Sequence, residues 1–419
     1  MAESNPVITT TPGPAAAGLE ANLRRLAAVR FLSWAHLMSA VIIPFFRDFG
    51  GLSFIAIFAL QTWFMLVWFL MEVPTGAVAD RFGRRFSVGL GCLVIAVASL
   101  LYGSVPLFPV FVCAEAIFAI GLALVSGADE ALAYDTLKAL GREAEAPRVM
   151  ARLEACKLAG IVTGALTGSL VAAALGLRWP MLLQSVPLFG AALLALGMKE
   201  PPSAQAAAAQ HPGYLRLLSG GLEHFRHAPE LRALALDQVA CATVAWLVIW
   251  LYQLQLARVG IPLAAYGLVH AVMGVSQVAL LARLALVERA LGGRARLVRA
   301  TAALPALCLL GLSLTTSAPL SVLLIVAAAC AGLGRPPLFS GAINSRIPSE
   351  RRATVLSAVS AARTLAVALL YPAVGAILDR SFPLTLAFLG VLGLVAAAAT
   401  AAPARLFDDG DARLGSAPA

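Results

Sequence analysis

Charged residues are scarce in this chain of 419 residues, because only 13% of its positions carry a charge and 60% are hydrophobic. Soluble domains carry about 25% charged residues, and a soluble fold of this length could not hide so much apolar surface. The composition therefore excludes a soluble globular protein. It predicts an all-α integral membrane protein, because helices satisfy their own backbone hydrogen bonds inside a bilayer.

Several other absences narrow the chemistry. The chain has no phosphate-binding loop of the P-loop type, and no serine, histidine and aspartate set stands out on a polar segment. The six cysteines lie inside apolar segments without a CxxC pair, so we expect packing residues and no metal site. We therefore expect no enzyme, no cofactor and no ATP-driven pump.

Twelve apolar segments are long enough to cross a bilayer at about 1.5 Å per residue. We place these spans at Leu26–Phe46, Leu52–Val78, Phe86–Val105, Leu107–Lys138, Leu153–Leu175, Trp179–Met198, Leu231–Leu256, Leu263–Val287, Leu297–Leu314, Leu320–Ile343, Ala353–Leu378 and Pro383–Ala401. The expected domains are an N-terminal six-helix bundle and a C-terminal one, joined by a linker and flanked by two tails. Their residues are 26–198 and 231–401 for the bundles, 199–230 for the linker, and 1–25 and 402–419 for the tails.

Basic residues concentrate in alternate loops, whereas the loops between them are short and carry few charges. Cytoplasmic loops carry such an excess of lysine and arginine. We therefore expect both termini, the linker and the basic loops in the cytoplasm, at the inner membrane of a bacterium. The first 24 residues lack the apolar core of a signal peptide, and apolar residues at helical spacing after Pro212 predict an amphipathic helix in the linker.

The loop between the second and third spans reads Gly-Ala-Val-Ala-Asp-Arg-Phe-Gly-Arg-Arg, residues 76–85, and we name it the signature loop. It resembles the signature loop of the major facilitator superfamily, Gly-x-Leu-Ala-Asp-Arg-x-Gly-Arg-Arg/Lys. The matching positions are Gly76, Ala79, Asp80, Arg81, Gly83, Arg84 and Arg85, with Val78 in place of leucine. The resemblance implies a transporter with two pseudo-symmetric six-helix bundles that works by alternating access. Residues 288–296 echo the loop in the second half.

The signature loop has a mechanical interpretation in the resembled family, where its aspartate braces the cytoplasmic start of span eleven. Here Asp80 would meet the backbone at residues 352–354, because a helix N-terminus favours an anion. The loop arginines can reach three acids at the cytoplasmic end of span four, which are Asp129, Glu130 and Asp135. Such a cluster would hold the two halves together and favour an outward-open state. A solvated loop that only sets the topology is the alternative.

Ionisable residues inside the spans are expected to face a cavity or a partner, because charges at mid-membrane are costly. Spans one, four, seven and ten line the central cavity in the resembled family, which makes candidates of His36, Glu115, Asp237 and Arg335. We take Glu115 as the first candidate for a proton carrier. The alternative is a permanent structural pair with Arg363 of span eleven.

Span five contains Gly160, Gly164 and Gly168, a spacing at which small residues let helices pack closely. The antiporter subgroup of the resembled family has a glycine-rich motif in this span that also holds a proline. Ala165 stands at the position of that proline here. We therefore interpret the three glycines as helix-packing positions.

These observations favour secondary active transport, with proton-coupled efflux of an amphipathic or drug-like compound as the first hypothesis. The second is uptake of an anionic metabolite by proton symport, with Arg30, Arg335 and Arg363 forming a positive site. The third is a non-transporting membrane receptor on the same fold. We expect a small molecule, protons and the lipid bilayer as partners of a monomer. We expect no nucleic-acid partner, because the concentration of basic residues in cytoplasmic loops accounts for the net positive charge.

Overall fold

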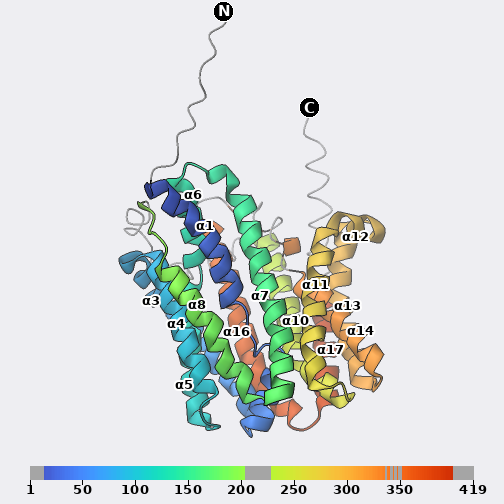
Figure 1. Ribbon diagram of the computed structural model, residues 1–419. Coiled ribbons are helices and arrows are strands. Elements are labelled where there is room, and N and C mark those ends of the chain that lie inside the picture. The colour runs from blue at the N-terminus through green and yellow to red at the C-terminus, as the bar shows by residue number, and fades with distance from the viewer. Residues whose placement is uncertain are drawn as a thin grey trace, which may run out of the picture.

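The computed structural model describes residues 14–202, 228–335, 337–339, 343, 347 and 352–399. Every regular element in this part of the chain is a helix. The helices run side by side along one long axis, and the blue-to-green half lies beside the yellow-to-red half (Figure 1). This arrangement confirms the all-α fold class. The linker expected at 199–230 lies for the most part outside the described residues.

The N-terminal half contains the elements up to α8. Their bounds are α1 Pro14–Ser33, α2 Ile42–Pro44, the π-helix η1 Phe45–Phe49, α3 Phe54–Phe82, α4 Arg84–Tyr102, α5 Phe108–Val125, α6 Ala128–Ala139, the 3₁₀ turn η2 Glu143–Glu145, α7 Ala146–Leu175 and α8 Arg178–Leu196. The expected fourth span is therefore two helices. They separate at Gly127, whose φ of +74° suits glycine.

The C-terminal half begins with α10. Its elements are α10 Pro229–Arg258, the 3₁₀ turn η4 Leu263–Ala265, α11 Tyr266–Ala282, α12 Leu284–Leu291, α13 Arg294–Leu314, α14 Ala318–Leu333, α16 Arg352–Leu378 and α17 Phe382–Ala399. The expected eighth span ends earlier than its hydropathy suggested, because the helix breaks at Arg283. The eleventh begins and ends within a residue of its expected bounds.

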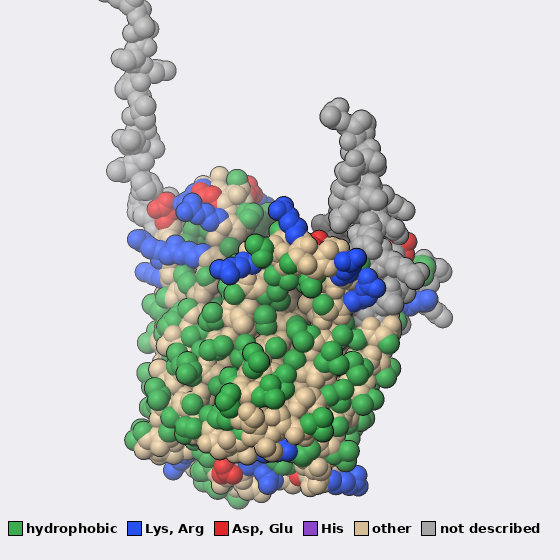
Figure 2. All heavy atoms as spheres, turned by 90° about the vertical axis from the view of Figure 1, so that its right-hand side faces the viewer, with side chains coloured by type: hydrophobic (Ala, Val, Ile, Leu, Met, Phe, Trp, Pro, Cys, Tyr) green, Lys and Arg blue, Asp and Glu red, His purple; other side chains and the backbone are tan. Residues whose placement is uncertain are grey.

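The outer surface is suited to a lipid bilayer. Figure 2 shows a broad belt of hydrophobic and uncharged side chains, with lysine, arginine and acidic side chains gathered above and below it. Within the described residues, eleven helices are long and apolar enough to cross a membrane. The protein is therefore a multi-pass membrane protein. We call the end of the molecule that carries residues 76–85 the signature-loop end, and the other the opposite end.

The expected first span is missing from these eleven because it is not one helix. After α1 ends at Ser33, residues 34–41 form irregular turns before the short α2 and η1 continue the crossing. We call residues 34–41 the broken segment. Side-chain amides satisfy part of its backbone, since Gln184 of α8 accepts a hydrogen bond from the Met38 N–H at 3.2 Å.

The glycine row of α7 packs against this region. A Cβ added to Gly164 would lie 2.6 Å from the carbonyl carbon of Ala35, and one added to Gly168 would lie 1.7 Å from the carbonyl oxygen of Leu37. Such distances leave no room for any side chain larger than hydrogen. Gly160 similarly faces the carbonyl oxygen of Phe31. The three glycines therefore let the backbone at the end of α1 and in the broken segment approach α7 closely.

Candidate functional site

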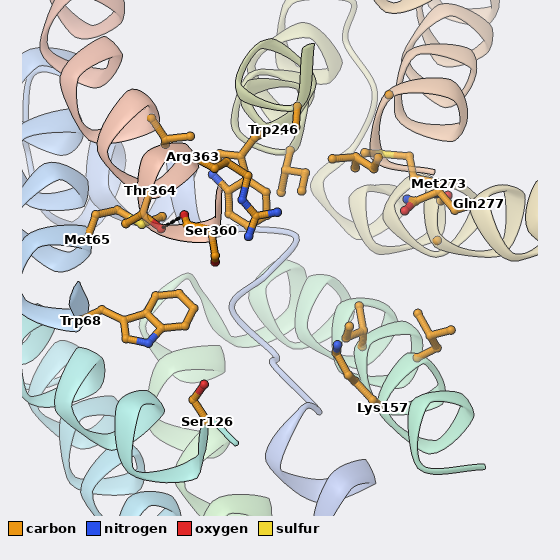
Figure 3. A pocket seen from close by; sticks show the side chains of 18 of the residues that line it. Met65, Trp68, Ser126, Lys157, Trp246, Met273, Gln277, Ser360, Arg363 and Thr364 are labelled. Carbon is orange, nitrogen blue, oxygen red and sulfur yellow. Dashed lines mark hydrogen bonds between the residues drawn. The ribbon is translucent and has the colours of Figure 1, made fainter. Parts of the chain in front are cut away.

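A cavity of about 520 Å³ lies between the two halves, near the middle of the molecule (Figure 3). The N-terminal half contributes residues of α3 and α7, and the C-terminal half contributes residues of α10, α11, α14 and α16. Much of the wall is apolar or aromatic. Its large members include Met65, Trp68, Ile161, Trp246, Ile249 and Met273. A mainly apolar wall with a few polar groups is typical of a small-molecule site.

Four charged side chains stand among these apolar groups. Lys157 and Glu154 of α7 form an ion pair with each other, with Nζ 3.0 Å from Oε1. The same Nζ lies 4.7 Å from the ring centroid of Trp34, at the start of the broken segment. Glu72 of α3 and Arg363 of α16 also line the cavity, and neither side chain is in a hydrogen bond or ion pair with another described residue.

The halves are joined by hydrogen bonds on the side of the cavity away from the signature loop. Asp379, just after α16, accepts hydrogen bonds from the N–H groups of Phe54 and Ile55 at 2.8 and 3.0 Å. These are the first residues of α3, so a carboxylate of one half caps a helix of the other. Farther in, the Thr62 hydroxyl donates to the carbonyl oxygen of Ala368 at 3.1 Å.

Gln253 of α10 makes a second connection at this end. Its side-chain oxygen accepts a hydrogen bond from the Ile43 N–H at 3.0 Å, and its nitrogen donates to the Ser39 carbonyl at 3.1 Å. A third connection joins the Ser169 hydroxyl of α7 to the Ala264 carbonyl at 3.1 Å. Every hydrogen bond between described residues of different halves lies on this side of the cavity, away from the signature loop.

The signature loop is fixed to its own half. Arg84 forms an ion pair with Asp135 of α6. Glu200 accepts hydrogen bonds from the N–H groups of Arg84 and Arg85, at 2.6 and 3.0 Å, at the start of α4. Gly83 makes this capping possible, because its φ is +97° and a Cβ would lie 2.8 Å from the Glu200 carboxylate. Among described residues, the Asp80 side chain takes part in no hydrogen bond or ion pair, and Gly76 has open space around it.

The other expected acids of this cluster pair with α1. Arg30 lies 2.7 Å from Asp129 and 2.9 Å from Glu130. These contacts and that of Arg84 stay within the N-terminal half, and no ion pair between described residues crosses to the other half. The expected pairing of loop arginines with these acids is formed by Arg84 and Asp135, whereas Asp129 and Glu130 pair with Arg30 of α1. Arg81 is placed over the ring of Phe82 at 5.7 Å.

Asp237 and Arg335 do not line the cavity. They pair with each other at 2.5 Å, and both side chains are almost inaccessible to solvent. Arg335 also donates to the Val298 carbonyl and the Thr301 hydroxyl of α13, at 2.5 and 2.9 Å. The pair joins three elements of the C-terminal half, so its charges are neutralised inside the protein.

Glu115 lies in the core of the N-terminal half and not on the cavity wall. Its side chain is buried and accepts a hydrogen bond of 2.6 Å from the Gln61 amide of α3. The alternative pairing with Arg363 is therefore absent. His36 lies in the broken segment, with its ring stacked on Trp34 at 5.4 Å.

Some residues of this site were not identified from the sequence. Asp379 and Gln253, which join the halves, are polar residues near the ends of apolar spans. Many polar side chains at such positions only set the topology, so the sequence did not reveal that these two contact the other half. Trp68 and Met65 lie on span two, which the resemblance did not assign to the cavity. Only the packing of α3 against α16, and of α7 against α11, brings these helices to the cavity wall.

Comparisons with known proteins agree with this architecture. The sequence profile described as "Major Facilitator Superfamily" matches residues 26–370. No curated protein sequence matches the chain significantly.

Several solved structures share the fold. The nucleoside transporter NupG superposes with a TM-score of 0.76 at 13% identity, over 92% of this chain and 98% of that one. A bacterial homolog to the human lysosomal transporter Spinster, inward-facing and unoccupied, gives 0.71 at 17% identity, over 95% and 99%. A D-xylose-proton symporter gives 0.69 at 16%, over 90% and 95%. The profile match covers most of the chain, and the chain therefore belongs to the Major Facilitator Superfamily of secondary transporters.

Proposed function

We propose that the protein exports an amphipathic or drug-like small molecule across the inner membrane in exchange for protons. The observation that carries this proposal is the cavity between the halves, with mostly apolar walls and a few charged side chains. Basic residues concentrated in the loops of the signature-loop end support a cytoplasmic position for that end and for both termini. We infer that the cavity opens at that end, to the cytoplasm, where an export substrate binds. We propose that the functional unit is a monomer.

Glu115 is the proposed proton carrier. It is a buried carboxyl within the membrane region whose hydrogen-bond partner, the Gln61 amide, is uncharged. Without a cationic partner, such a group can be neutral in one state of the transport cycle and ionised in another. His36 stays a second candidate for proton transfer, because it lies in the broken segment between α1 and α2.

The signature loop is the proposed gate of the other conformation. Asp80 takes part in no hydrogen bond between described residues while the cavity is open, so its carboxylate is available to the start of α16 when the halves close. The pairs of Arg84 with Asp135 and of Arg30 with Asp129 and Glu130 would keep the N-terminal side of this gate rigid. Asp80→Asn should leave the fold intact and lower the population of the conformation that is closed at the signature-loop end.

Uptake of an anionic molecule is the second candidate function, and Arg363 favours it. Of the three arginines expected to form a positive site, Arg30 and Arg335 are neutralised by acids, whereas Arg363 faces the cavity. A single arginine can bind a carboxylate or phosphate group by two parallel hydrogen bonds. Inward transport of an anion found in a substrate screen would support uptake as the function.

Substrate-screened flux in proteoliposomes with an imposed pH gradient tests the leading proposal. The expected result is gradient-driven flux in the parent protein, uncoupled from the gradient by Glu115→Gln. Glu288→Gln is the matched control, since it removes a carboxylate from a surface ion pair with Arg294. Flux that ignores the gradient would contradict proton coupling. A complete absence of flux for every compound would favour a receptor.

A further inference from the structure

The charges on the cavity wall come in two kinds. Lys157 and Glu154 are three residues apart on α7 and neutralise each other at 3.0 Å. Glu72 and Arg363 remain, and among described residues neither of them has a hydrogen-bonding or ionic partner. The cavity therefore offers one anionic and one cationic side chain that have no partner among the described residues.

These two side chains belong to different halves but to helices that touch. The Thr62 hydroxyl contacts the Ala368 carbonyl, and α3 and α16 run in opposite directions. Counted from this contact, Arg363 lies opposite Val67. Glu72 is five residues nearer the signature-loop end, about 7.5 Å farther along the helix axis at 1.5 Å per residue. Both side chains are long enough to reach one small molecule between them.

Two tryptophans line the same cavity as the two charges. Trp68 lies one turn before Glu72 on α3, and Trp246 of α10 lines the cavity together with Arg363 (Figure 3). Lys157 points into the same space from the other side of the cavity in that view. Indole rings bury apolar groups and tolerate nearby cations. The wall can therefore enclose an apolar body while its two ends meet opposite charges.

Alternating access gives the unpaired charges a role. When the halves close over the cavity, water must leave it, and an ionised side chain without a partner then loses its favourable solvation. A ligand that carries a charge of each sign removes this penalty for Glu72 and Arg363 together. A singly charged ligand removes it for only one of them.

We propose, building on the transport function above, that the substrate is an amphipathic zwitterion. Its anionic group faces Arg363, its cationic group faces Glu72, and its apolar body lies between Trp68 and Trp246. The two halves each hold one end of the molecule. Substrate binding therefore supplies the charge neutralisation that lets the halves approach at the signature-loop end.

A series of four indole compounds with the same apolar body tests this proposal. Tryptophan is zwitterionic, tryptamine is a cation, indole-3-propionate is an anion, and indole is uncharged. The readouts are the ligand-induced shift of the unfolding temperature of the purified protein and flux into proteoliposomes. We expect tryptophan to bind roughly tenfold or more tightly than each singly charged compound, because a hydrogen bond to a charged group contributes about 1.5–3 kcal/mol.

Two substitutions assign the ends of the ligand. Arg363→Gln should remove the preference for tryptophan over tryptamine and keep its preference over indole-3-propionate. Glu72→Gln should do the reverse. The matched controls are Arg283→Gln and Glu288→Gln, which remove charges outside the cavity lining and should change neither preference.

Three results would overturn the zwitterion assignment. The first is equal binding of all four compounds, and the second is no binding of tryptophan at millimolar concentration. The third is an equal loss of binding for every compound in both variants. That result would mean that Glu72 and Arg363 pair with each other when the carrier closes without a ligand. Gradient-driven flux of an unrelated compound in any of these cases would leave the transport function standing. A transporter that moves nothing in the wider screen would contradict the function itself.

Discussion

At the scale of single residues, the buried pair of Asp237 and Arg335 makes a direct prediction about stability. Removing one partner leaves an uncompensated buried charge, which costs about 3–5 kcal/mol. We therefore expect Asp237→Asn to lower the free energy of unfolding by an amount near that range, measured by chemical unfolding in detergent. Glu288→Gln, which breaks a partly exposed pair at 2.8 Å, should cost less than about 1 kcal/mol. Equal losses would mean that the buried pair is not an important source of stability.

The sequence identified most of the ionisable residues in the membrane but not their partners. Glu115, Asp237 and Arg335 were all recognised as charges that need an explanation, since apolar spans make them conspicuous. Their partners lie up to 98 positions away in the chain, as for Asp237 and Arg335. Spacing along one helix carries no information on such contacts. The sequence therefore could not separate Arg363, which faces the cavity, from arginines already neutralised.

At the scale of elements, the first crossing shows where hydropathy fails. The segment Leu26–Phe46 is apolar enough to predict one helix, yet the helix ends at Ser33. The break is stabilised from outside the segment, by the amides of Gln184 and Gln253 and by the glycines of α7. A composition average over one span cannot include contributions from three other helices. Span eleven forms one continuous helix, and its expected bounds agree with α16.

The close packing of α7 against the broken segment predicts a sharp difference between two glycines. Gly168→Ala places a methyl group on the Leu37 carbonyl oxygen, at 1.7 Å before any adjustment, and overpacking of this kind costs about 1–3 kcal/mol. Gly190→Ala on α8 is the matched control, because its Cβ would lie 3.7 Å from Leu32. It should be neutral or stabilise the helix by up to about 1 kcal/mol. Unfolding temperatures of the two variants that shift alike would contradict the packing.

Two carboxylates at opposite ends of the molecule, those of Asp379 and Asp80, are expected to have opposite effects on conformation. Asp379 caps α3 in the present conformation, and Asp80 is proposed to brace α16 in the other. A cap contributes about 1 kcal/mol, which changes a two-state ratio roughly fivefold. Asp379→Asn should therefore open the opposite end, and Asp80→Asn should keep it closed.

Spin labels at Leu177 and Ser317 measure this change, because the two positions lie in loops of different halves at the opposite end. Asp379→Asn should increase the fraction of long distances, and Asp80→Asn should decrease it. Arg380→Gln, beside Asp379 but outside the capping bonds, is the control. The same distance distribution in all variants would show that neither carboxylate biases the equilibrium.

At the scale of the whole molecule, the sequence predicted the architecture but not the conformation. Twelve apolar segments, a central polar stretch and repeated loop motifs are properties of composition and order, and they are retained in any state of the transport cycle. The end at which the cavity opens depends on a few contacts such as those of Asp379 and Gln253. Two conformations of one transporter differ by only a few kcal/mol, a difference that no reading of span composition resolves.

The rocking of two halves around the cavity predicts that joining them at the opposite end stops transport without stopping binding. The Ser169 hydroxyl lies 3.1 Å from the Ala264 carbonyl of the other half, and we choose these two positions for a pair of cysteines to be joined by oxidation. We expect the oxidised double variant to bind ligand from the signature-loop end, measured by thermal stabilisation, and to lose flux. Reduction should restore flux, and each single variant should transport in both redox states. Undiminished flux with the disulfide fully formed would mean that the halves need not separate here, because alternating access requires this end to open once in every cycle.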